Sequence, residues 1–119
     1  MEKNQNSKRY DLEERTEEFA RRVGMFVERL PKSLSNVEYG KQLIRSSGSV
    51  GANYIEANEA LSRKDFVMRI KICRKESKES RYWLRLVHCP EAASIEQQSL
   101  IQEGTELMKI FGAILTKSS

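Results

Sequence analysis

The chain has 119 residues, which is enough for one domain with its own core and too few for two. Charged residues make up 32% of it and apolar residues 39%, a balance that excludes a disordered chain and is typical of a helical protein. The net charge is +4, no apolar run approaches the length of a membrane span and the N-terminal sequence is polar, so we expect a cytoplasmic protein.

The first predicted helix runs from about Asp11 to Leu30. Apolar side chains recur at every third or fourth position between these residues, as on the buried face of a helix. Asp11 is a plausible N-cap, and Pro31 ends the helix because proline cannot continue it. Residues 1–10 are polar, and we expect them to be disordered or frayed.

The second predicted helix runs from Ser35 to Leu61. Ser35 and Glu38 have the spacing of a capping box, in which each side chain bonds a free backbone N–H of the first turn. The apolar period continues through Leu43 and Val50 without a break.

Two further helices are predicted in the second half of the chain. One runs from Ser62 to about His88, with an acid three residues after the serine. The other begins at Ser94, with Gln97 three residues later, and its inward-facing residues are Leu100, Leu107, Phe111 and Ile114. Connections this short favour an all-α, antiparallel up-down-up-down four-helix bundle, formed by residues 11–117 as a single domain.

The second helix contains a run of small residues, "SSGSVGA", at residues 46–52. A phosphate-binding loop would need a lysine after the glycines or a strand before them, and both are missing. Glycine in a helix costs about 1 kcal/mol relative to alanine, which close helix packing can offset. Folding back near residue 61 places Ser47 level with Ser77, and Gly51 level with Cys73. The predicted packing residues are Ser47, Gly48, Gly51, Ala52, Cys73 and Ser77.

The third helix carries the positive charge of the protein. Residues 62–90 hold nine basic and three acidic groups, whereas residues 1–30 hold seven of each. A helical wheel places seven cations in one continuous band. We call these residues the basic band: Lys64, Lys71, Arg74, Lys75, Lys78, Arg81 and Arg85. A solvated face with Glu76 and Glu79 as partners is the simpler reading, but these acids lie on another side of the wheel. The band therefore predicts a nucleic-acid site without sequence-specific readout.

A second apolar stripe lies almost opposite the first on the third helix. It consists of Met68, Ile72, Trp83 and Leu86. A helix in an isolated bundle needs only one apolar face, so these side chains predict an interface between copies of the chain.

Catalysis and metal binding find little support. His88 and Cys89 are adjacent, so they do not face each other on a helix, and no second pair with ligand spacing occurs. No catalytic residue, metal or cofactor is predicted. Cys73 and Cys89 are expected to be reduced thiols. Asn53 and Glu56 are expected to bond across the bundle, for example to Lys71 or Arg69.

Four segments together resemble a known family: "DLEERTEEFARRV", "LP", "QLIRSSGSVGANYIEANEA" and "SRKDFVMRIKICRKESKESRYWLRL". They are similar to the four-helix-bundle proteins encoded in intervening sequences of bacterial 23S ribosomal RNA genes, over roughly residues 11–115. One departure is Ala57, where relatives commonly have glycine. That family is similar in architecture to the accessory protein of diversity-generating retroelements, a basic homopentameric barrel that works with a reverse transcriptase. The resemblance thus implies a ring-shaped homo-oligomer, a pentamer.

Two functions remain open at this point. In the first, the protein is a non-enzymatic, RNA-binding homo-oligomer whose bands act together. In the second, it is a protein-interaction scaffold or accessory subunit, and the band binds an acidic partner such as an enzyme that handles RNA.

Overall fold

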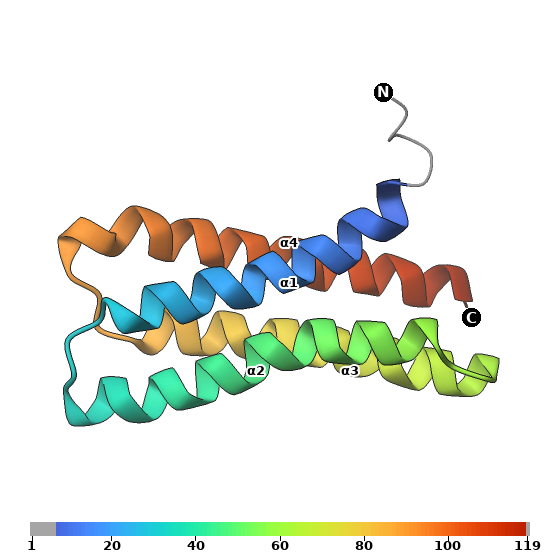
Figure 1. The fold of residues 1–119 in the computed structure, drawn as a ribbon, viewed down its shortest axis with the longest axis horizontal. Helices are drawn as coiled ribbons and strands as arrows, with labels where there is room; N and C mark the ends of the chain where they lie inside the picture. The colour runs from blue at the N-terminus through green and yellow to red at the C-terminus, as the bar shows by residue number, and fades with distance from the viewer. Residues whose placement is uncertain (1–6, 119) are drawn as a thin grey trace.

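The computed structural model describes residues 7–118, and within them it is all-α with four long helices and no strand. The elements are α1 (Ser7–Glu28), α2 (Leu34–Asn58), α3 (Arg63–Leu86), the short 3-10 helix η1 (Glu91–Ala93) and α4 (Ser94–Ser118). The helices lie side by side, and their connections alternate between the two ends of the bundle (Figure 1). The all-α class and the four helices are therefore confirmed.

Two helices begin earlier than their sequence signals predicted. α1 starts at Ser7 and not at Asp11, while residues 1–6, also predicted to be frayed, lie outside the described residues. α2 starts at Leu34, because the Ser33 side chain and not that of Ser35 caps it by accepting a hydrogen bond from the Asn36 N–H at 3.1 Å.

Asn36 explains why Ser33 is the cap. Its amide nitrogen donates to the carbonyls of Pro31 at 3.0 Å and His88 at 2.9 Å, and its side-chain oxygen accepts from the His88 N–H at 2.8 Å. Asn36 is buried, so these bonds satisfy a side chain that would otherwise be costly to bury. They join the connection between α1 and α2 to the end of α3.

The start of α3 matches its sequence signal. Ser62 caps it by accepting a hydrogen bond from the Asp65 N–H at 3.0 Å. Its last residue is Leu86, two residues before the predicted end at His88, and α2 likewise ends before Leu61, which is fully exposed.

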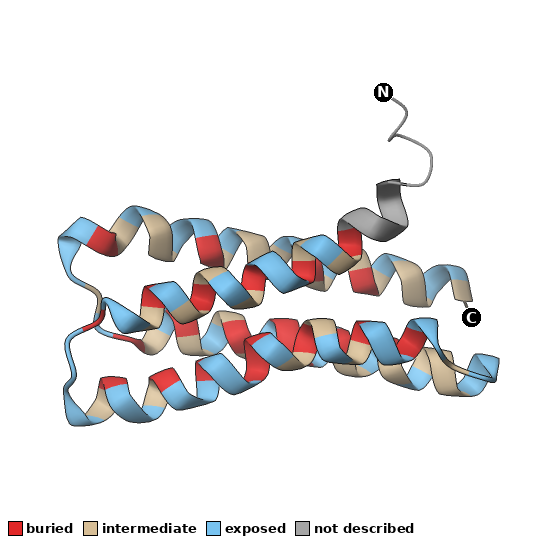
Figure 2. Ribbon diagram, viewed as in Figure 1, coloured by how far each residue is buried: buried red, intermediate tan, exposed pale blue. Residues whose placement is uncertain are grey.

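The core runs along the centre of the bundle, where the buried faces of the four helices meet (Figure 2). The predicted apolar periods of α1, α2 and α4 are confirmed, since Phe19, Leu43, Val50, Leu107 and Phe111 are buried. Burying each such side chain contributes roughly 1.5–3 kcal/mol.

Small residues bring α2 and α3 together, as expected. The hydroxyls of Ser46 and Ser80 are 2.9 Å apart, and the Cys73 thiol donates to the carbonyl of Val50 at 3.4 Å. Arg69 donates to the Asn53 side-chain oxygen at 2.9 Å, which confirms that predicted bond. These pairs run in opposite residue order along the two helices.

The glycines of the small-residue run act differently from the prediction. A Cβ atom at Gly51 would lie 3.0 Å from Oγ1 of Thr16, so this glycine permits the approach of α1 and does not face Cys73. Gly48 and Ala52 are exposed, and a Cβ at Gly48 would meet nothing within 4 Å. They therefore have no packing role within the chain.

Ser47 and Ser77 are both buried, but each hydroxyl bonds a carbonyl of its own helix, at 3.3 Å and 2.9 Å. A further close approach was missed: a Cβ at Gly104 of α4 would lie 3.7 Å from the carbonyl oxygen of Ser77. The small residues of α3 thus serve α4 as well as α2.

Candidate nucleic-acid interface

The seven cations of the basic band lie along α3 on the side away from the core. Lys64 and Arg85 mark its ends, about 30 Å apart at the helical rise of 1.5 Å per residue. Six of the seven are exposed, and Arg81 is half-buried. The band keeps its orientation because Ile70 and Leu84 of the same helix are fully buried in the core.

Two arginines of the band lean toward α4. Arg81 donates to the hydroxyl of Thr105 at 3.3 Å. A Cβ at Gly112 would lie 3.8 Å from Nε of Arg74, so this guanidinium extends over a glycine of α4. The band therefore covers both the outer surface of α3 and the seam between α3 and α4.

No cation of the band forms a salt bridge within the part of the chain that the structure describes. The two acids nearest in sequence, Glu76 and Glu79, bond instead to Arg45 of α2. Glu79 also accepts a hydrogen bond from the Trp83 indole at 3.1 Å. The acids of α3 thus face α2, and the cations keep their full charge for a ligand.

Glu76 is the one buried acid of α3. One of its oxygens is 3.7 Å from the Arg45 guanidinium, and the other is buried without a hydrogen-bond partner among the described residues. Burying a carboxylate with an unsatisfied oxygen costs free energy, and the ion pair with Arg45 offsets part of this cost.

The second apolar stripe of α3 is partly covered by the chain itself. Trp83 is half-buried, with ring centroids 5.9 Å from Tyr39 of α2 and 5.0 Å from Tyr82. Ile72 and Leu86 are also half-buried, whereas Met68 is 44% exposed.

A larger exposed apolar face lies on α2 and was not predicted. Val37, Ile44 and Ile55 are 39%, 49% and 54% exposed, with Gly48 between them. The same wheel that exposed the second stripe of α3 would have found it, because these residues fall outside the buried period of α2.

Burial makes both thiols harder to ionise. Burial raises the pKa of the Cys73 thiol to about 12, so it stays neutral. Burial also raises the pKa of Cys89, whose thiol donates to the adjacent Pro90 carbonyl. Across residues 7–118 no group of three or more His, Cys, Asp and Glu side chains could hold a metal ion.

Over the same described residues, none of the helices has the length and apolar character needed to cross a membrane.

Comparison with known proteins supports the resemblance seen in the sequence. The model of the 23S rRNA-intervening sequence protein family matches residues 8–113. A crystal structure of a protein of unknown function from the S23 ribosomal protein family, from Bacteroides thetaiotaomicron, is 30% identical in sequence with a TM-score of 0.80. The match covers 92% of this chain and 98% of that one. No curated protein matches the chain.

Proposed function

This chain belongs to the 23S rRNA-intervening sequence protein family, and we propose that it is a non-enzymatic RNA-binding protein of the cytoplasm that works as a homo-oligomer. One observation carries the proposal: the cations of the basic band have no carboxylate partners among the described residues, although each of the other three helices has residues in such pairs.

Unpaired cations in a row are suited to a phosphate backbone. Each phosphate that a lysine or arginine neutralises releases counterions. The logarithm of the binding constant therefore falls linearly with the logarithm of the salt concentration, with a slope of about 0.7–0.9 per contact. Because phosphates carry no sequence information, the expected binding is steeply salt-dependent and tolerant of sequence. Tyr82, 56% exposed beside the band, is the aromatic side chain placed to stack on a base.

The proposed assembly is a ring of identical subunits, a pentamer as the resemblance to retroelement accessory proteins implies. Support comes from two apolar faces that one chain leaves exposed or half-covered: Ile72, Trp83 and Leu86 on α3, and Val37, Ile44 and Ile55 on α2. Contact between two different faces gives a head-to-tail interface, which closes into a ring when the rotation between subunits returns to the first one. Several bands on one ring would bind RNA with higher avidity than a single band.

A second candidate function is a scaffold that holds an acidic protein, such as an RNA-handling enzyme, against the band. The exposed apolar face of α2 favours it, because interfaces between proteins need a desolvated apolar centre.

The test compares two triple charge reversals that change the net charge equally. The first changes Lys71, Arg74 and Lys78 to Glu, within the band; the control changes the exposed cations Arg29, Lys32 and Lys109 to Glu, outside it. Binding of fluorescent structured RNA is measured by anisotropy over a salt series. We expect the band variant to lose roughly 100-fold in affinity at low salt, with a salt slope smaller by about 3, and the control to lose much less.

Equal losses in the two variants would show that net charge alone attracts the RNA and would refute the band. If the parent binds no RNA at low salt, the proposal falls and the scaffold function takes its place. Light scattering of all three proteins checks that their oligomeric state is the same.

A further inference from the structure

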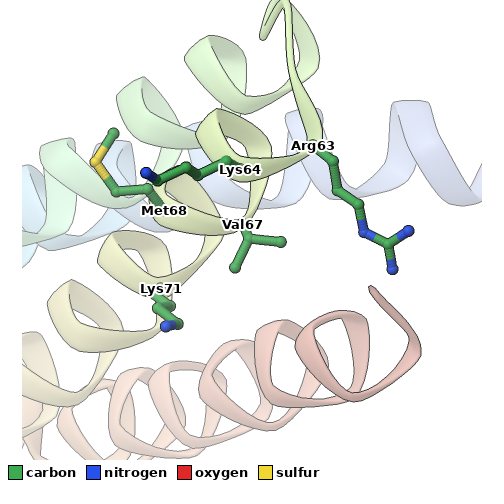
Figure 3. A pocket seen from close by; sticks show the side chains of 5 residues that line it. All are labelled: Arg63, Lys64, Val67, Met68 and Lys71. Carbon is green, nitrogen blue, oxygen red and sulfur yellow. The ribbon is translucent and has the colours of Figure 1, made fainter. Parts of the chain in front are cut away.

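Side chains of the first three turns of α3 line an open hollow of about 570 Å³. Five residues line it: Arg63, Lys64, Val67, Met68 and Lys71. Figure 3 shows all five extending from these turns, with Val67 near the middle and Arg63 reaching toward the end of α4. Three of the lining side chains are cations, and two are apolar.

Cations and apolar side chains line the hollow together. Lys64 and Lys71 are seven residues apart, which separates them by about 10 Å along the helix axis. The Arg63 guanidinium donates a hydrogen bond to the carbonyl oxygen of Ser118, so it is held where α3 and α4 meet. Lys64 and Lys71 also belong to the basic band, which makes the hollow one end of that band.

Met68 is the feature that the band itself does not explain. It is 44% exposed and lies between lysines, whereas a phosphate site needs no apolar surface. The sequence pattern placed Met68 at a subunit interface with Ile72, Trp83 and Leu86. Those three are half-buried, and only Met68 lines the hollow.

We propose that this hollow receives an unpaired base of a single-stranded or looped RNA segment. The face of the base lies against Met68 and Val67, while Arg63, Lys64 and Lys71 hold the phosphates on either side. The inference rests on the proposed function and deepens it, since it names unpaired RNA as the preferred ligand of the band.

The chemistry of the lining matches a nucleotide in both its parts. The polarisable thioether of methionine makes favourable contacts with aromatic rings, and its flexible chain adapts to any of the four bases. In a duplex the base faces are covered by stacking, so only an unpaired base can offer its face to Met68. The hollow is within the size range of small-molecule sites.

The test uses Met68→Gln, which keeps the length and charge of the side chain and removes its apolar end. Met25→Gln is the matched control, because Met25 is also exposed, at 64%, but lies on α1 outside the band. Each protein is titrated with a fluorescent single-stranded RNA and with the same strand in a duplex, over a salt series. Thermal melts and light scattering follow folding and assembly.

We expect Met68→Gln to weaken single-strand binding roughly 3- to 10-fold and to leave duplex binding unchanged. The salt slope should stay the same, because an apolar contact releases no counterions, whereas loss of a lysine would lower it by about 1. Met25→Gln should change neither affinity.

Any one of the following results would overturn the inference. If Met68→Gln changes the affinities for single strand and duplex equally, or changes neither, no unpaired base binds in the hollow. The proposed function would still stand. A changed oligomeric state would return Met68 to a subunit interface. Each protein is also titrated with vesicles of an anionic phospholipid. If Met68→Gln loses binding to these vesicles while its RNA binding is unchanged, the hollow is a lipid site. If the parent binds neither RNA, the proposed function falls with the inference.

Discussion

The seam between α1 and α4 and the outer surface of α3 use the same charged residue types in opposite ways. On the seam, Arg15 bonds Glu103 at 2.9 Å and Glu106 at 2.8 Å, and Arg22 bonds Glu96 at 3.2 Å. On α3, the basic band has no such partners among the described residues. Cations thus join two helices in one region and stay available for a ligand in the other.

The two regions differ in whether their arginines bond to carboxylates. The pKa of Arg15 is raised above its usual value, first by its hydrogen bond to Glu103. Arg15 and Glu103 are only 30% and 17% exposed, so solvent screens this pair less than a pair on the open surface. Such an arginine serves stability, and the predictions below separate that role from RNA binding.

The largest effect on stability is expected from Glu103→Gln, which leaves Arg15 without its two-point partner. Removing one side of a partly buried, charge-assisted pair should lower the free energy of unfolding by about 1–2 kcal/mol. Urea unfolding measures this loss. RNA affinity should not change, because neither residue belongs to the band.

The control for that variant is Glu17→Gln, which breaks a pair with Arg21 on the exposed side of α1. Both side chains are more than half exposed, so solvent screens the pair and we expect a much smaller loss than for Glu103→Gln. If the free energy of unfolding falls equally in both variants, the pairs of the seam stabilise the protein no more than exposed pairs do. The contrast with α3 would then disappear.

The next largest effect is expected on RNA affinity and not on stability, from replacing one cation of the band by an uncharged residue. Lys78→Gln removes an exposed cation without a carboxylate partner, so the free energy of unfolding should stay within about 0.5 kcal/mol of the parent. RNA affinity should fall a few-fold at low salt, with a slope smaller by about 1. Lys109→Gln on α4 is the matched control, and a loss of affinity there as large as at Lys78 would contradict the band.

Helical periodicity was enough to predict the all-α class and the four helices of this chain, because period, caps and prolines are local signals. The buried faces and the Ser62 cap followed from residue spacing, and Arg69 was one of the two partners expected for Asn53. The position of Ser33 as the cap of α2 did not, since it depends on Asn36 reaching the end of α3, a contact between distant parts of the chain.

The small-residue run shows the same limit at the level of packing. Glycine and serine indicate that a helix is approached closely, but not which neighbour approaches. Gly51 faces Thr16 of α1, and Ser46 rather than Ser47 pairs across to α3. A rotation of one residue, 100°, decides between these partners, and the wheel alone does not fix it.

Within the candidate site, some positions could be predicted from the sequence and others could not. The seven cations could be grouped from the sequence because they lie on one helix. The hollow at Met68 could not, because the wheel grouped Met68 with Ile72, Trp83 and Leu86, whereas in the structure Met68 is exposed and the other three are half-buried.

The smallest expected effect concerns acid and again separates the two regions. The pKa of Glu106 is lowered below its ordinary value of 4.5, first by a hydrogen bond from Gln102 and then by the bond from Arg15. A carboxyl with a lowered pKa in the folded protein contributes stability above about pH 4.5, and this contribution is lost as the pH falls through the folded value.

Thermal melts between pH 6 and pH 3 should therefore show a slightly shallower decline for Glu106→Gln than for the parent, because the variant has lost this titrating group. Lys75→Gln, which changes an exposed cation of the band, should decline in parallel with the parent, since it leaves every carboxyl of the seam in place. A parallel decline of Glu106→Gln as well would mean that the pair with Arg15 adds nothing to the folded state. In that case Glu103 alone would distinguish the seam from the open face of α3.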